Sequence, residues 1–399
     1  MTVDRQPGRA LRDIPSAIWV LGFVSLLMDV SSEMIHSLLP VFMVTVLGTG
    51  TIAVGVVEGL AESLALVVRV FSGTLSDYWR KRKGLAVLGY ALGAFSKPLF
   101  ALASGLDLVL GARLIDRVGK GLRGAPRDAL IADLAPSYLR GAAFGLRQSL
   151  DTVGAFLGPL LAAGLMLLWA NDFRAVFWVA VVPGVLAVGL LYFGIHEPES
   201  GSDTKRRNPI QWTTVSRLGS RYWWVVGFGA MFTLARFSEA FLALRAQQGG
   251  MPISAVPLVL VAMNVIYALS AYPFGRLADR TRHTTLLALG LLALIAADLV
   301  LATYDHWDVV VVGVGLWGLH LGMTQGLLAT MVADAVPADL RGTGFGMYNL
   351  VSGIAMLVAS VLAGFLWDRH GPAVTFYAGA SFCILSLVGL VGYQVKHEH

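Results

Sequence analysis

A short polar segment that occurs twice constrains the fold of this chain more than any other feature. GTLSDYWRKRKGLAVLGY, residues 73–90, returns in weaker form as GRLADRTRHTTLLALGL, residues 275–291. Gly73, Leu75 and Asp77 recur as Gly275, Leu277 and Asp279, with a shift of 202 (73 to 275). A second pair, ADLAPSYLRGAAFG from Ala132 and ADAVPADLRGTGFG from Ala333, is shifted by 201 (132 to 333). The sequence therefore predicts one structural unit that is duplicated within 399 residues.

The composition places this duplicated unit in a membrane. Hydrophobic residues make up 56% of the chain, charged residues only 14%, and the mean hydropathy is +0.70, whereas soluble domains carry about 25% charged residues. Apolar stretches of about 20 residues, enough to cross a hydrocarbon core of roughly 30 Å as helix, recur along the chain. We expect twelve spanning helices, near residues 17–40, 52–75, 84–104, 108–132, 141–167, 174–195, 222–246, 254–275, 284–303, 308–332, 342–366 and 373–394. The first stretch is too long for a signal peptide and no small-residue cleavage site follows it, so we expect no cleaved leader.

These spans predict an N-terminal six-helix bundle over 1–195, a polar linker over 196–221 and a C-terminal six-helix bundle over 222–399. Lys and Arg gather before the first span, after the second, in the linker and after the eighth, while the intervening loops hold few or none. By the positive-inside rule, both termini are expected in the cytoplasm of a multi-pass protein of the plasma (inner) membrane. The pI of about 9.4 then reflects topology and contact with anionic lipid. Because no basic stripe is interleaved with aromatic residues, we expect no nucleic-acid partner.

The loop between the second and third spans carries a family signature. Gly73, Leu75, Asp77, Lys81 and Arg82 match the pattern G-x-L-x-D-r-x-G-r-k, with Arg80 at the position that is usually glycine. In this location the pattern resembles that of the major facilitator superfamily of secondary transporters, and the resemblance covers essentially the whole chain. It implies an all-α membrane fold of two pseudo-symmetric six-helix bundles, alternating access and a monomer. It also implies that Gly73, Asp77, Lys81 and Arg82 latch the bundles in the outward-facing state.

The fourth and fifth spans extend the resemblance. Arg117, Lys120 and Gly121 fit the family pattern R-x-x-q-G with lysine in place of glutamine, and the matched arginine is associated in the family with proton coupling. Arg113 precedes Arg117 by one helical turn and faces the same side. Gly154, Gly158 and Pro159 in GAFLGP are similar to the antiporter signature of proton-coupled exporters, which implies export, and small residues followed by a proline can shape a hinge. Ordinary packing of small residues is the alternative interpretation of this motif. We assign Arg123, Arg127 and Asp128, further along the fourth span, to solvated positions at the cytoplasmic interface.

Ionisable residues inside the spans are the candidate coupling groups. A charge at the bilayer centre costs at least ~2.5–3.5 kcal/mol, so such residues usually face a cavity. Asp29, Glu33 and His36 lie on one face of the first span, and Glu239 is the pseudo-equivalent of Glu33 in the seventh. An arginine that moves relative to a buried carboxyl group would load and unload a proton. We therefore expect proton coupling at Glu33, Asp29, Glu239 and Arg117, although static ion pairs are the alternative.

The resemblance implies that the first, fourth, seventh and tenth helices line a central cavity. The substrate cavity is then expected to include His36, Arg113, Arg236, His320 and Gln325. Asp29, Glu33 and His36 also offer oxygen and nitrogen ligands for a divalent transition metal, so a metal transporter is an alternative. Proton-coupled uptake of an organic anion is another, because the arginines would attract one. A receptor without transport is disfavoured by so much buried charge.

Several function classes have no support in the sequence. No Walker signature or phosphate-binding glycine loop is present, and no nucleophile triad can be identified, so we expect neither ATP coupling, nor an enzyme, nor a cofactor. The single cysteine, Cys383, excludes an internal disulfide. Lys97 and Asp298 are isolated charges in apolar spans, and the sequence does not name their partners. The leading hypothesis is a proton-coupled antiporter that exports small organic molecules.

Overall fold

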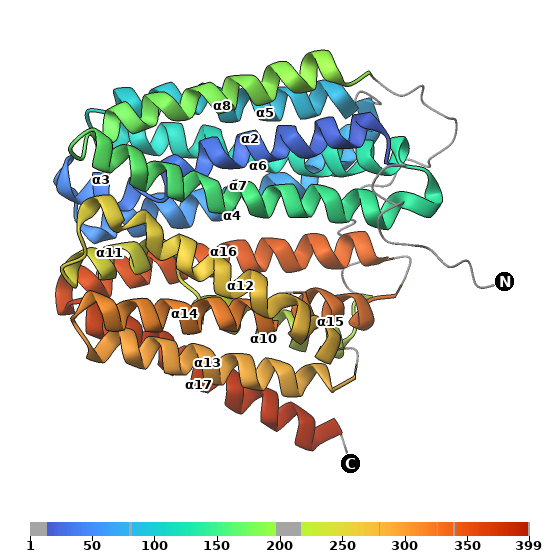
Figure 1. The fold of residues 1–399 in the computed structure, drawn as a ribbon. Coiled ribbons are helices and arrows are strands. Elements are labelled where there is room, and N and C mark those ends of the chain that lie inside the picture. Colours follow the sequence, from blue (N-terminus) through green and yellow to red (C-terminus); the bar gives the residue numbers. More distant parts are fainter. Residues whose placement is uncertain are drawn as a thin grey trace. The chain divides into compact units, whose positions relative to one another are not determined.

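The computed structural model describes residues 14–79, 82–196, 217–278, 280–324, 326–337 and 340–397, and within these ranges the chain is helical with no strand (Figure 1). The helices of the first half are α2 (Ser16–His36), α3 (Leu39–Thr45), α4 (Thr51–Trp79), α5 (Arg82–Leu102), α6 (Leu106–Leu134), α7 (Arg140–Leu168) and α8 (Phe173–Gly194). Those of the second half are α10 (Ser220–Ala235), α11 (Ala240–Gln248), α12 (Pro257–Ala278), α13 (His283–Thr303), α14 (Trp307–Thr324), α15 (Leu327–Ala335), α16 (Arg341–His370) and α17 (Pro372–His397).

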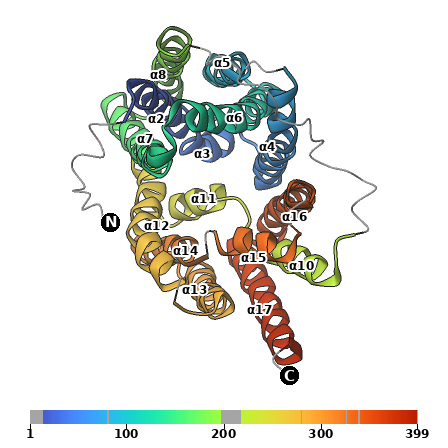
Figure 2. The same cartoon turned by 90° about the vertical axis from the view of Figure 1, so that its right-hand side faces the viewer.

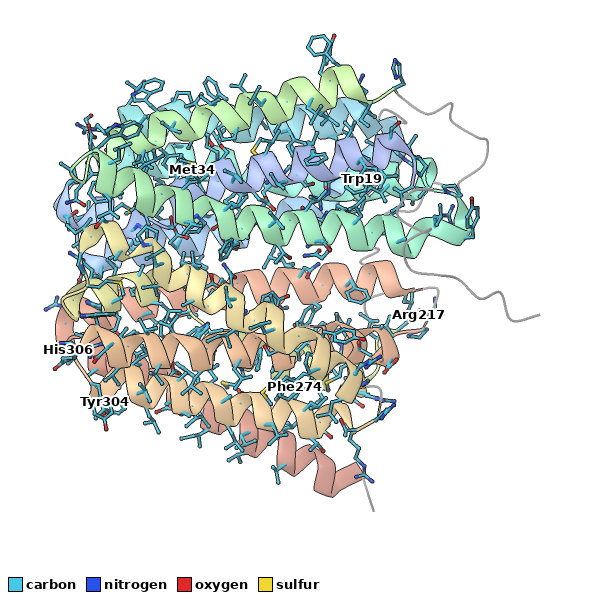
Figure 3. The ribbon with its side chains drawn as sticks, in the orientation of Figure 1. Trp19, Met34, Arg217, Phe274, Tyr304 and His306 are labelled. Carbon is cyan, nitrogen blue, oxygen red and sulfur yellow. The ribbon has the colours of Figure 1, made fainter. Side chains whose placement is uncertain are left out.

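All twelve predicted spans coincide with helical stretches. Within the described residues, eleven stretches are long and apolar enough to cross a membrane. The one predicted span outside these eleven is the fourth, 108–132, which corresponds to α6. The 29 residues of α6 include many charged side chains. Large apolar side chains project from the outer faces of the helices, as expected for contact with lipid (Figure 3). The predicted all-α membrane fold is confirmed.

The helix ends follow ordinary capping chemistry. Asp172 precedes α8, and its side chain accepts hydrogen bonds from the backbone N–H groups of Arg174 and Ala175 at 3.0 and 3.1 Å. Gly371 ends α16 with φ of +86°, a conformation that glycine adopts without strain. These local signals place the start of α8 and the end of α16 near the predicted boundaries.

Three of the spans are interrupted. The first breaks between α2 and α3 at residues 37–38, the seventh between α10 and α11 at residues 236–239, and the tenth between α14 and α15, where Gly326 has φ of +85°. Moving the first break by the 201 to 202 positions of the sequence repeat places it on the second. Interrupted helices in membranes are tolerated where the freed backbone is buried in protein or lines a cavity. The breaks therefore indicate the parts of the fold suited to binding.

Packing divides the chain into two compact units. Unit 1 comprises Met1–His36, Val68–Ala162 and Asp172–Asn208, and unit 2 comprises Ser37–Val67, Ala163–Asn171 and Pro209–His399. In unit 1, α5 packs against α6 and α8, which Figure 2 shows end-on. In unit 2, α13 packs against α14 and α17. The bundle boundaries at 1–195 and 222–399 stay a prediction, and residues 197–216 of the predicted linker 196–221 lie outside the described ranges.

A side chain distant in sequence caps α4 within unit 2. Asp368 of α16 accepts the backbone N–H of Thr51 at 2.9 Å and that of Ile52 at 3.0 Å, and the Thr51 hydroxyl donates to the same carboxylate. The first N–H groups of a helix have no partner within it and carry the positive end of the helix dipole, so a carboxylate there is stabilising. Asp368 thus fixes the start of α4 on the end of α16.

Removing this cap should be measurable. Asp368→Ala is expected to lower the free energy of unfolding by about 0.5–2 kcal/mol, the usual effect of losing a capping side chain. Thermal unfolding of the purified protein in detergent would report the change. Arg369→Ala is the matched control, because Arg369 is the exposed neighbour on the same helix end. Equal destabilisation by the two variants would contradict the capping role.

Candidate functional site

Asp116 of α6 is the centre of a buried charge network in unit 1. Its Oδ1 accepts a hydrogen bond from Lys97 Nζ of α5 at 2.7 Å, and its Oδ2 lies 3.3 Å from His36 Nε2 of α2. Lys97 also donates to Ser32 Oγ at 3.0 Å. Lys97 is 0% exposed and Asp116 is 1% exposed, so water screens this pair very little. Three helices are thereby joined through one carboxylate.

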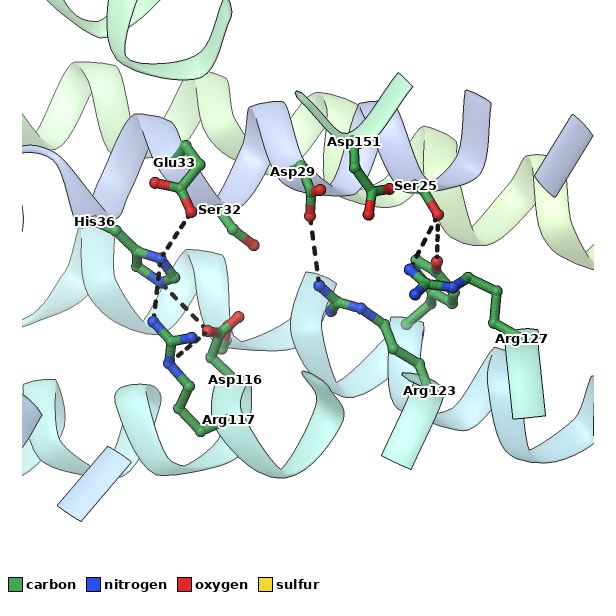
Figure 4. Close-up of polar contacts among 12 residues, drawn as sticks. Ser25, Asp29, Ser32, Glu33, His36, Asp116, Arg117, Arg123, Arg127 and Asp151 are labelled. Carbon is green, nitrogen blue, oxygen red and sulfur yellow. Dashed lines mark hydrogen bonds and ion pairs between the residues drawn. The ribbon is translucent and has the colours of Figure 1, made fainter. Parts of the chain in front are cut away.

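His36 lies between two carboxylates (Figure 4). Its Nδ1 is 3.7 Å from Glu33 Oε1, while its Nε2 faces Asp116. Arg117 approaches the same ring, with Nη2 3.4 Å from His36 Nδ1, and its Nε is 3.9 Å from Asp116 Oδ2. A proton on either ring nitrogen would therefore have a carboxylate within 4 Å. Arg113, one turn before Arg117 on α6, is buried as well.

Asp29 belongs to a second group on the same face of α2. It is 3.8 Å from Arg123 of α6, whose guanidinium lies 4.9 Å over the ring of Tyr90. Ser25 accepts a hydrogen bond from Arg127 at 3.2 Å and lies 3.1 Å from the Tyr90 hydroxyl. Arg123 and Arg127 are 5% and 9% exposed, so the prediction of a solvated interface position for these two arginines is wrong. Their charges are instead buried against Asp29, Tyr90 and Ser25.

The alternative metal site is not formed. Asp29 faces Arg123, whereas Glu33 and His36 face the Asp116 network (Figure 4). In the part of the chain that the structure describes, no group of three or more His, Cys, Asp and Glu side chains is arranged to hold a metal ion. Asp29, Glu33 and His36 are therefore not gathered into one metal site in this structure. Arginine and lysine compensate these carboxylates instead.

The glycines of GAFLGP pack directly on the helix that carries the carboxylates. A Cβ atom at Gly154 would lie 2.9 Å from Asp29 Cβ and 2.7 Å from the Leu26 carbonyl oxygen. A Cβ atom at Gly158 would lie 2.7 Å from Glu33 Cβ. Such distances are too short for any side chain, so α7 approaches α2 this closely only because both positions are glycine. Pro159 follows within α7, and the role of the motif as a hinge stays a prediction.

In unit 2, the candidate residues gather at the interrupted seventh helix. Arg236 follows the last residue of α10, and its guanidinium lies 5.8 Å over the ring of Phe232. The same ring is 5.4 Å from that of His320 on α14. His320 is 0% exposed, and its Nδ1 is 2.8 Å from the Gly290 carbonyl oxygen, which can only accept, so the proton is on Nδ1. Its Nε2 has no hydrogen-bond partner among the described residues.

Other predicted site residues are placed less completely. Glu239 precedes α11 and is exposed. Lys81 and Gln325 lie outside the described residues. Gly73 and Asp77 belong to α4, and the side chain of Asp77 is outside the described part. Arg82 forms an ion pair with Asp133 at the end of α6. Of the predicted latch, Arg82 is thus engaged within unit 1. The meeting of all cavity residues in one central site stays a prediction.

Sequence reasoning missed Asp116 and Lys97 as members of the site. A signal was present, because Lys97 sits in an otherwise apolar span and a buried lysine needs an acidic partner. Spans 84–104 and 108–132 are joined by a short loop and must be antiparallel neighbours, so a carboxylate in the second could reach a lysine in the first. Asp116 is the acid at a matching distance from the loop.

Comparisons with known proteins agree with this fold. The family model described as Major Facilitator Superfamily matches residues 21–252 and 237–398. An uncharacterized MFS-type transporter of Methanocaldococcus jannaschii is 34% identical over 382 residues, which are 94% of each chain. The chain belongs to the major facilitator superfamily. It is accordingly a multi-pass membrane transporter of small molecules, not an enzyme.

More distant members of the superfamily align over nearly the full length. The quinolone resistance protein NorA of Staphylococcus aureus is 21% identical, over 96% of this chain and 97% of its own. Among solved structures, a variant of the nucleoside transporter NupG has a TM-score of 0.80 at 13% identity, covering 94% of this chain and 99% of that chain. A POT family transporter in complex with a thioalcohol conjugated peptide has a TM-score of 0.78 at 12% identity, covering 96% of each chain. These structural matches show the fold alone.

Proposed function

We propose that this transporter is a proton-coupled antiporter that exports small organic molecules. The observation that carries the proposal is His36, buried between Glu33 and Asp116 and next to Lys97 and Arg117. The proposal also places the protein in the inner membrane as a monomer with cytoplasmic termini. The antiporter-like motif of α7 and the similarity to the quinolone resistance protein NorA support the direction of transport.

Charge balance in the network explains how a proton could be exchanged for a substrate. Lys97 and Arg117 face Asp116, and His36 faces Glu33. A proton added to Glu33 or His36 adds one positive charge to a site that water hardly screens, which raises the energy of any other cation there. A proton and a substrate that presents a hydrogen-bond donor or positive charge to Glu33 would therefore exclude each other. Mutual exclusion at one site is the requirement for antiport.

The arginines support uptake of an organic anion less well. In unit 1, Arg117 lies 3.9 Å from Asp116 and Arg123 lies 3.8 Å from Asp29. Arg147 forms an ion pair with Asp151 on α7. Asp29 and Asp151 offset the charges of Arg123 and Arg147, and Asp116 is shared by Lys97 and Arg117, so only part of the positive charge is left to attract an anion.

The coupling role of Glu33 can be tested in proteoliposomes with an imposed pH gradient. A compound panel is first screened for thermal stabilisation of the purified protein, since a specific ligand raises apparent stability. Each stabilising compound should then collapse the gradient with the native protein. With Glu33→Gln the collapse should fall to that of empty liposomes while stabilisation by the compound persists. Asp308→Asn, at a side chain 61% exposed, is the control that should behave as the native protein. Full collapse with Glu33→Gln would refute the proposal.

A further inference from the structure

Asp298 of α13 is a buried acid that the transport site does not use. It is 0% exposed, and neither carboxylate oxygen has a hydrogen-bond partner among the described residues. Asp116, the other completely buried acid discussed above, is by contrast surrounded by donors and cations. An ionised carboxylate without a partner is strongly disfavoured away from water. Burial without a hydrogen-bond partner therefore favours the neutral, protonated form of this acid.

The carboxyl group lies against the interrupted part of the seventh helix. It faces Gly379 of α17, where a Cβ atom would lie 2.6 Å from Asp298 Oδ2 and 3.1 Å from Phe237 Cε1. The side chains of Asp298 and Phe237 therefore cover the same small patch of α17. Phe237 belongs to the break between α10 and α11. Breaks of this kind are where coupling ions bind in many transporters, because the non-helical backbone can change conformation.

Few titratable groups surround Asp298. On α17, Cys383 is buried one helical turn after Gly379. On α14, His320 faces the carbonyl of Gly290, about two turns before Asp298 on α13. From the break of the seventh helix come Arg236, next in sequence to Phe237, and the exposed Glu239. Arg245 of α11 donates to the carbonyl of Leu301, about one turn after Asp298 on α13, and is held there by Asp305. Arg236 lies in the break itself, so a rearrangement of the break would move it relative to the acid.

We propose that Asp298 is a proton-binding site separate from the network around Asp116. The proton is held while Phe237 covers the acid. When residues 236–239 rearrange and admit water, the O–H bond breaks, its electron pair stays on the carboxylate and the proton passes to water. Arg236 then supplies positive charge next to the new anion. This assignment concerns unit 2 alone and does not depend on the role proposed for Glu33.

Infrared spectroscopy of the purified protein in lipid nanodiscs tests the proposal without a substrate. The native protein should show the carbonyl band of a protonated carboxyl group at neutral and at alkaline pH. Asp298→Asn should lose this band, whereas Asp308→Asn, at an exposed side chain, should keep it. After transfer to heavy water the band should shift as the proton exchanges. Phe237→Ala should make that exchange several-fold faster.

Each contrary result overturns the assignment. Absence of the band from the native protein, or its persistence in Asp298→Asn, would show that Asp298 is ionised. A band that never exchanges in heavy water would show a permanently sealed acid with no part in proton movement. If Asp298→Asn does not fold, Gly379→Ala is the second variant, because it keeps the acid but places a methyl group against it. A shift of the carbonyl band in Gly379→Ala would then assign the band to Asp298. An unshifted band in that variant would contradict the assignment.

Discussion

Asp116→Ala should destabilise the protein by about 3–5 kcal/mol, because it would leave a buried charge without its partner. Lys97 is completely buried, and besides Asp116 the structure shows it donating to Ser32. Removing the carboxylate leaves the ammonium group with a neutral hydroxyl in a water-poor interior. Thermal and denaturant unfolding in detergent would measure the loss, and transport should disappear as well.

A paired replacement separates stability from function. Lys97→Met combined with Asp116→Leu removes both charges of this pair and fills similar space, so part of the lost stability should return, while the buried Arg117 still lacks the carboxylate that it faces. Transport should stay absent, since His36 and Arg117 would have lost the carboxylate that they face. If the double variant were as unstable as Asp116→Ala, the ion pair would not be the cause of the destabilisation. If it transported normally, the network would have no part in coupling.

Gly158→Leu should abolish transport and destabilise the protein by about 1–3 kcal/mol through overpacking. Its Cβ atom alone would meet Glu33 Cβ at 2.7 Å and the Val30 carbonyl oxygen at 3.0 Å, so α7 would have to move away from α2. That movement would also displace Glu33 from His36. The measurements are unfolding in detergent and gradient collapse in proteoliposomes.

The matched control is on the same helix. A Cβ atom at Gly164 of α7 meets nothing within 4 Å, and the position is exposed. Gly164→Leu therefore adds the same side chain without crowding α2 and should transport normally. Loss of transport in both variants would mean that any large side chain added to α7 stops transport. The close contact of Gly158 with Glu33 would then not be the reason for the glycine at that position.

The fold could be predicted from the sequence because hydrophobic length is a local signal. Each span had to be long enough to cross the hydrocarbon core. The sequence repeat showed which helix of the first half corresponds to which helix of the second. Even α6, with its charged side chains, was found, since its charges lie within an otherwise apolar stretch of the right length. The interruptions at residues 37–38 and 236–239 were not predicted. The second break contains no proline or glycine, whereas Pro40 lies in the first turn of α3 directly after the first break and is a signal for it.

The site could be predicted only in part because ion pairing depends on three-dimensional contacts. Glu33, His36 and Arg117 do come together, as their positions on polar faces suggested. Asp29, four residues before Glu33, instead faces Arg123, and spacing along one helix cannot show which residue of another helix lies opposite. The same limit hid the partner of Lys97. The partner of a buried charge depends on the residues that surround it in the fold, and the sequence of one helix does not show which residues those are.

The ion pair between Arg82 and Asp133 bears on how the protein is made. Arg82 begins α5 and Asp133 lies at the end of α6, so this contact joins the two segments whose repetition first revealed the duplication. It needs nothing beyond residue 133, and it can form once α6 has left the ribosome and entered the bilayer, long before α10 is translated. The start of α5 and the end of α6 can thus be joined during synthesis, so the first half can begin to fold before the second half has been translated.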